Sequence, residues 1–166
     1  MTVELLADLL LLTHALVGSI FLGALIGRWV ILGLAERAES LVAVQTLTRA
    51  AAPFERAVIV GSAVVLVLGI ATAIAQGRPF LGPLQGARID WLFVSLVLYL
   101  SIIPLVPAIF LPRGRRFEAA LEDATQRNEL TPALAAAFRD PVVRAAHVYE
   151  LSAVTLVFAL MVAKPV

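Results

Sequence analysis

Three ionisable side chains lie inside long apolar stretches of this chain: His14, His147 and Glu150. An imidazole can carry a proton or ligate a metal through a ring nitrogen, and a carboxylate can take a proton or bind a cation. A charged side chain at the centre of a bilayer costs about 2.5–3.5 kcal/mol or more. Each of the three therefore needs a partner or a function.

His14 is placed to ligate the iron of a heme b. It shares a helical face with Gly18, one turn along, and the glycine would leave room for the flat macrocycle. Met161 or Tyr99 would approach the other face of the heme. Its propionates would meet one of two arginines, Arg78 or Arg88. The alternative is a single hydrogen-bonded histidine, which donates to a backbone carbonyl or to Tyr99.

His147 and Glu150 are three residues apart, a spacing that can supply two ligands to a metal ion. They also lie near the cytoplasmic ends of the expected helices, so they can instead belong to a charged network that fixes helix register. A proton or ion path is a further alternative. We expect Glu150 to contact Arg28, Arg56 or His147. The members of the expected network are Arg28, Glu55, Arg56, Arg144, His147 and Glu150.

His14 and Glu150 should not meet. At 1.5 Å of helix per residue, His14 falls toward the outer side of the membrane and Glu150 toward the cytoplasm, with His147 further in. We therefore expect an outer layer around His14 and an inner layer around Glu150, and no site built from both histidines.

Four apolar runs must position these residues: roughly 7–34, 57–76, 91–111 and 142–163. Each is long enough to cross a hydrocarbon core of about 30 Å, which takes about 20 helical residues. The chain is 61% hydrophobic and 15% charged, whereas soluble proteins average about 25% charged. The expected fold is all-α, a four-transmembrane-helix bundle that forms one domain over residues 1–166.

Basic residues set the expected orientation. Of the thirteen lysines and arginines, ten flank the first and third connections: Arg28, Arg37, Arg49, Arg56, Arg113, Arg115, Arg116, Arg127, Arg139 and Arg144. Cytoplasmic loops of membrane proteins carry an excess of such residues. The sequence therefore predicts that both termini are outside, in a multi-pass protein of the bacterial cytoplasmic (inner) membrane.

The connections carry their own signals. Residues 36–50 keep helical spacing, so we expect the first helix to continue past the membrane or to turn along its surface as a short cytoplasmic helix, with Pro53 marking the break before the second membrane helix. Residues 114–127 indicate a second cytoplasmic helix, in the third connection. Thr131-Pro132 and Asp140-Pro141 are typical helix starts. Pro104 and Pro107 should kink the third membrane helix, and the Gly- and Pro-rich segment 77–90 should form an irregular loop.

The composition of the chain excludes some classes of function and partner and favours others. The chain has no cysteine, so disulfides and thiolate chemistry are excluded. The scattered basic residues do not indicate nucleic acid binding. Lipid is the expected surrounding. Gly23 and Gly27 match the small-xxx-small pattern that lets two helices approach closely, so a homodimer through this face is one interpretation.

Four short patterns occur along the chain: the run from His14 to Gly23, Gly69-x-x-Thr72, Asp90-Trp91 and the closing 160–165 segment LMVAKP. With these patterns the chain resembles an uncharacterised bacterial family of predicted integral membrane proteins, domain of unknown function 2269. More distantly, a first-helix histidine followed by glycine is similar to the heme-binding membrane protoporphyrinogen oxidase and the copper-resistance D membrane domain. That similarity implies heme. The oxidase-like proteins pair this histidine with a lysine in a later helix, whereas the only lysine here is Lys164, at the outer end of the last helix.

Two classes of function stay open on the sequence, and whether the chain is an enzyme stays open with them. One is a heme-binding redox protein with an intramembrane pocket around His14. The other is a non-enzymatic membrane component, a transport or permeation subunit or an assembly partner. It would use the small-residue helix faces and the inner charged network.

Overall fold

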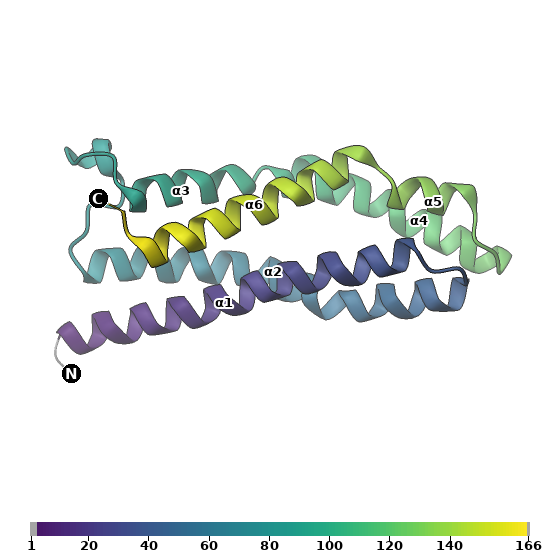
Figure 1. Cartoon of the computed structure of the whole chain (residues 1–166), viewed down its shortest axis with the longest axis horizontal. Coiled ribbons are helices and arrows are strands. Elements are labelled where there is room, and N and C mark those ends of the chain that lie inside the picture. Colours follow the sequence, from purple (N-terminus) through teal and green to yellow (C-terminus); the bar gives the residue numbers. More distant parts are fainter. Residues whose placement is uncertain (1–2, 166) are drawn as a thin grey trace.

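A computed structural model gives the structure of the chain and describes residues 3–165. The described residues form helices joined by turns and short loops (Figure 1). The elements are α1 (Val3–Glu36), α2 (Leu41–Ala75), the 3₁₀ turn η1 (Gly82–Gln85), α3 (Trp91–Ile102), the π-helical turn η2 (Val106–Phe110), α4 (Leu111–Arg127), α5 (Pro132–Phe138) and α6 (Pro141–Ala163).

The long helices form two pairs. Helix α1 packs along α2, and α3 packs along α6, while α1 and α6 join the two pairs (Figure 1). Both ends of the chain and the loop that contains η1 lie at one end of the bundle, which we call the termini end. The short helix α5 and the end of α4 lie at the opposite end, which we call the α4–α5 end.

Four segments are long and apolar enough to span a membrane: Val3–Glu36, Leu41–Ala75, Trp91–Arg127 and Pro132–Ala163. Most of each span is not buried against the rest of the chain, and its exposed side chains include large apolar ones such as Ile20 (67% exposed) and Val67 (65%). Such a surface suits contact with lipid. At 1.5 Å per residue, the 34 residues of α1 extend well beyond a hydrocarbon core of about 30 Å.

The separate helix expected over 36–50, between the first two membrane helices, is absent. The chain turns after Glu36, and Ser40 caps a new helix by accepting from the amide of Ala43 at 3.2 Å. Residues 41–50 are therefore the first turns of α2, which continues through Pro53. A helix tolerates proline when its surroundings compensate for the lost hydrogen bond. Here Ala51 and Val58 are buried on either side, and Phe54 packs against Gly27 of α1.

The expected interruption near Pro104 and Pro107 is present. Helix α3 ends at Ile102, and the chain passes through η2 before it continues as α4. Proline removes a backbone donor and clashes with the preceding turn, which favours the wider π-helical turn. Because this π-helical turn is wider than an α-helical one, Phe110 and the residues after it point in other directions than they would in a regular α-helix.

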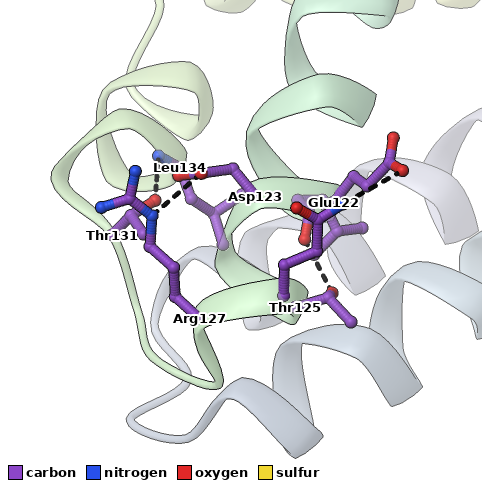
Figure 2. Close-up of polar contacts among 8 residues, drawn as sticks. Glu122, Asp123, Thr125, Arg127, Thr131 and Leu134 are labelled. Carbon is purple, nitrogen blue, oxygen red and sulfur yellow. Dashed lines mark hydrogen bonds and ion pairs between the residues drawn. The ribbon is translucent and has the colours of Figure 1, made fainter.

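The α4–α5 end has a small core of its own. Val44 of α2, Ala124 of α4 and Leu134 of α5 are almost fully buried together. Thr131 caps α5 by accepting from the amide of Leu134 at 3.3 Å, and Arg127 pairs with Asp123 at 2.9 Å (Figure 2). Gln45 donates to Thr125 at 2.9 Å and so joins α2 to α4. The helices expected over 114–127 and from Pro132 are thus present at this end.

The main core lies between the two helix pairs. Phe21, Leu25, Val58, Tyr99 and Val154 are its larger buried members. This apolar layer separates His14, toward the termini end, from the residues around Glu150. The separation into two polar layers follows from it.

Candidate functional site

His14 and Met161 meet in the layer near the termini end. The imidazole Nε2 lies 3.4 Å from the Met161 sulfur, and only 8% of His14 is exposed. The other ring nitrogen, Nδ1, is buried and makes no hydrogen bond of regular geometry among residues 3–165, although the imidazole also interacts with the Val65 backbone of α2. A histidine has one donor and one acceptor nitrogen when neutral, so this ring keeps unused bonding capacity.

A cavity of about 260 Å³ opens beside this pair. His14 and Gly18 of α1, Gly69 of α2, Tyr99 of α3 and Met161 of α6 line it, so all four long helices contribute. Most of its wall is apolar. Arg78 and Lys164 line it as well, and both also border a second, polar hollow with Glu4 and Asp8 at the termini end.

Two glycines shape the cavity in different ways. Gly18, expected to leave room beside His14, has nothing within 4 Å of the place where a Cβ would lie. Gly69 faces the imidazole directly, and a Cβ on it would lie 3.0 Å from His14 Cε1. The close approach of α2 to His14 therefore depends on Gly69, and the open space depends on Gly18.

Tyr99 and Arg78 lie at the cavity with partners of their own. The Tyr99 hydroxyl donates to the Ser62 carbonyl at 2.7 Å, and within residues 3–165 no hydrogen bond joins Tyr99 to His14. Arg78 donates to Gln76 at 3.2 Å, and its guanidinium lies 5.7 Å from the Trp91 ring centroid. Arg88, the other expected arginine, does not line the cavity.

The second layer is a charged cluster, expected from the sequence, of Arg28, His147 and Glu150. Arg28 Nη2 donates to Glu150 Oε2 at 2.5 Å and lies 3.2 Å from His147 Nδ1. His147 Nδ1 is also 3.5 Å from Glu150 Oε2. The expected contact of Glu150 with Arg28 is therefore present, and the pair joins α1 to α6.

An aromatic ring from η2 covers this cluster. Phe110 stacks on His147 with ring centroids 4.7 Å apart, and the Arg28 guanidinium carbon lies 5.7 Å from the centroid of the same Phe110 ring. Sequence reasoning missed Phe110. The prolines that precede it were visible, but the π-helical turn sets the direction of Phe110.

The other residues expected in the inner network stand apart from the cluster. Glu55, Arg56 and Arg144 are exposed, and within residues 3–165 no hydrogen bond or ion pair joins them to Arg28, His147 or Glu150. Arg28 contacts His147 Nδ1 and Glu150 Oε2, the two atoms that were candidates to ligate a metal ion. The described chain has no group of three or more His, Cys, Asp or Glu residues that could hold a metal ion.

The family described as "Predicted integral membrane protein (DUF2269)" matches residues 8–165. The chain belongs to this family. No curated protein and no solved structure matches the chain.

Membership in this family establishes a multi-pass integral membrane protein. Both polar layers lie within the matched residues of this family member. Gly27, one of the two glycines of the expected homodimer face, already packs against α2 of its own chain, because a Cβ on it would lie 2.6 Å from Phe54. Gly23 has nothing within 4 Å of that position, and the homodimer stays a prediction.

Proposed function

We propose that the cavity beside His14 binds heme b and that the protein is a redox component of the membrane. The observation that carries this proposal is the meeting of His14 Nε2 and Met161 Sδ, from the first and last long helices, at the wall of an apolar cavity. Imidazole and thioether are the axial pair of many electron-transfer hemes.

The donor atoms at the cavity suit such a group, whereas the cavity of about 260 Å³ would have to widen to admit the whole macrocycle. His14 Nε2 and Met161 Sδ would hold the iron, and because they are now 3.4 Å apart, the two side chains would move apart to admit it. A helix side chain such as Met161, which has three rotatable bonds, accommodates this movement readily. The Val65 backbone, with which the His14 imidazole interacts, would orient the ring for ligation.

The mouth of the cavity suits the acidic edge of the macrocycle. Arg78 and Lys164 border it near the termini end, and guanidinium and ammonium groups bind carboxylates well. The apolar wall would cover the ring faces. When bound, heme would supply one-electron chemistry, and Met161 as a ligand would raise its reduction potential. The chain's own part is to hold the iron, exclude water and neutralise the propionates.

The orientation supports electron exchange on the outer side of the membrane. Ten of the thirteen basic residues flank the connections that meet at the α4–α5 end. We therefore place the α4–α5 end in the cytoplasm and the cavity toward the outer side of the inner membrane.

The absorption spectrum of the purified protein tests this proposal. Protein from heme-replete cells should show a Soret band, and His14→Ala should lose it while remaining folded and monodisperse in detergent. His147→Ala is the matched control, because that histidine lies in the other layer. A colourless wild-type protein, or loss of the band in His147→Ala alone, would contradict the assignment. The non-enzymatic alternative would then take precedence.

A further inference from the structure

Two hollows adjoin at the termini end, and they differ in character. The apolar cavity beside His14 has a volume of about 260 Å³, and the polar hollow next to it has a volume of about 380 Å³. Gln76, Arg78 and Lys164 line both hollows, so the two meet at these residues.

The polar hollow carries charges of both signs. Glu4 and Asp8, one turn apart on α1, line it together with Arg78 and Lys164, which follow α2 and α6. Within residues 3–165, no ion pair joins any of these four side chains to another residue. Arg78 donates to Gln76 through Nε, which leaves the two terminal guanidinium nitrogens for a ligand. Unpaired charges of both signs around one hollow suit a ligand that also carries both.

The apolar cavity opens between α1 and α6. Ala15 and Ser19 of α1 and Phe158 and Val162 of α6 line it, and all four are exposed. The residues of α2 and α3 that line the cavity are buried or only partly exposed. These parts of α1 and α6 belong to segments that can span a membrane, so the opening faces hydrocarbon.

The depth of the cavity matches one leaflet of a bilayer. Along α6, its lining runs from Lys164 to Val154, which is about 15 Å of helix. Half of a hydrocarbon core of about 30 Å is the same length. A lipid whose headgroup lies at the termini end could therefore extend one acyl chain along the whole cavity.

We propose that the two hollows together bind a phospholipid of the phosphatidylethanolamine class, taken from the leaflet at the termini end. One acyl chain enters the apolar cavity between α1 and α6. Arg78 and Lys164 bind the phosphate. Glu4 and Asp8 bind the ammonium group of the headgroup.

The carboxylates give the site its headgroup selectivity. A primary ammonium donates up to three hydrogen bonds, as a lysine does. The trimethylated nitrogen of phosphatidylcholine donates none, and the glycerol headgroup of phosphatidylglycerol has no positive charge to meet Glu4 and Asp8.

This inference does not rest on heme. An apolar cavity open to hydrocarbon gains dispersion contacts when a chain fills it, and an acyl chain is thinner than a macrocycle. The lipid therefore occupies the cavity in the heme-free protein. Heme would have to displace it, because both ligands use the space beside His14.

Native mass spectrometry of the full-length protein from heme-depleted cells tests the selectivity. Phospholipids with identical acyl chains and ethanolamine, choline or glycerol headgroups are titrated separately. We expect one ethanolamine lipid per chain and about tenfold weaker binding of the other two, the difference that one charge-assisted hydrogen bond makes. Binding of either other lipid as tightly as the ethanolamine lipid would overturn the headgroup assignment. No bound lipid would overturn the site.

Removing the carboxylates tests their role. Glu4→Gln with Asp8→Asn, both at exposed positions, should abolish the preference for ethanolamine. Arg88→Gln is the control, because this arginine near the same end lines neither hollow, and it should leave the preference unchanged. A preference that survives the loss of both carboxylates would overturn the assignment of the ammonium site.

Filling the opening tests the path of the chain. Ser19→Phe should lower the binding of all three lipids about tenfold, the loss expected when part of a buried chain is displaced. Ile20→Phe, at an exposed neighbouring position that does not line the cavity, should not. Equal binding in the two variants would place the chain elsewhere.

The lipid and heme proposals fail separately. A Soret band in heme-replete protein, with no lipid bound to the heme-depleted protein, would overturn the lipid site alone. A retained ethanolamine lipid in a colourless protein would overturn the heme site alone. One heme and one such lipid bound to the same chain would show that the acyl chain does not use this cavity.

Discussion

His14 Nε2 lies 3.4 Å from the sulfur of Met161, although 147 residues separate the two along the chain. The contact joins the first and last long helices near the end where both termini lie. An imidazole facing a thioether gains little from it as a hydrogen bond, because the sulfur is a weak acceptor. In the proposed function, the two side chains act as a pair of ligands.

Filling the cavity should prevent heme binding without unfolding the protein. Gly18→Leu places a large side chain in open space beside His14, since nothing lies within 4 Å of a Cβ there. We expect the Soret band to be lost and the thermal unfolding in detergent to be unchanged. Gly33→Leu on the same helix, also in open space, should leave both unchanged. A full Soret band in Gly18→Leu would place the heme elsewhere.

Breaking the buried ion pair should destabilise the protein strongly. Arg28→Gln leaves Glu150 charged and without its cation, which costs about 3–5 kcal/mol in other proteins. Removing both charges, in Arg28→Gln with Glu150→Gln, should recover most of this loss. Denaturant unfolding in detergent micelles measures the three variants. A double variant no more stable than Arg28→Gln would show that the pair adds no specific interaction.

The four long helices, the interruption at Pro104 and Pro107, and the Arg28–Glu150 contact could be predicted from the sequence. Apolar length, proline chemistry and the cost of an unpaired buried charge determine them directly. The path of α2 through Pro53 could not, because it depends on Phe54 packing against Gly27 from another helix. The stacking of Phe110 on His147 depends on the π-helical turn, and the approach of Gly69 to His14 on how two helices are rotated. The spacing of residues along one helix predicts neither of these two contacts between helices.

Cysteine labelling should give the orientation of the bundle. The excess of basic residues at the α4–α5 end predicts that this end is cytoplasmic. In intact cells, an impermeant reagent should label Leu84→Cys, which is 81% exposed in η1, and should not label Gln126→Cys at the end of α4. Permeabilised cells should label both. The reverse labelling pattern in intact cells would show that the protein has the opposite orientation, with the His14 cavity on the cytoplasmic side.

The central claim is that His14 and Met161 together hold one heme iron, and redox potentiometry of Met161→Leu tests it most directly. Leucine keeps the size and apolar character of the side chain but cannot ligate. Since an axial methionine raises the reduction potential, we expect the variant to keep its heme through His14 and to titrate at a lower potential than the wild type, with a shifted Soret band. The same potential and spectrum in both proteins would contradict the claim.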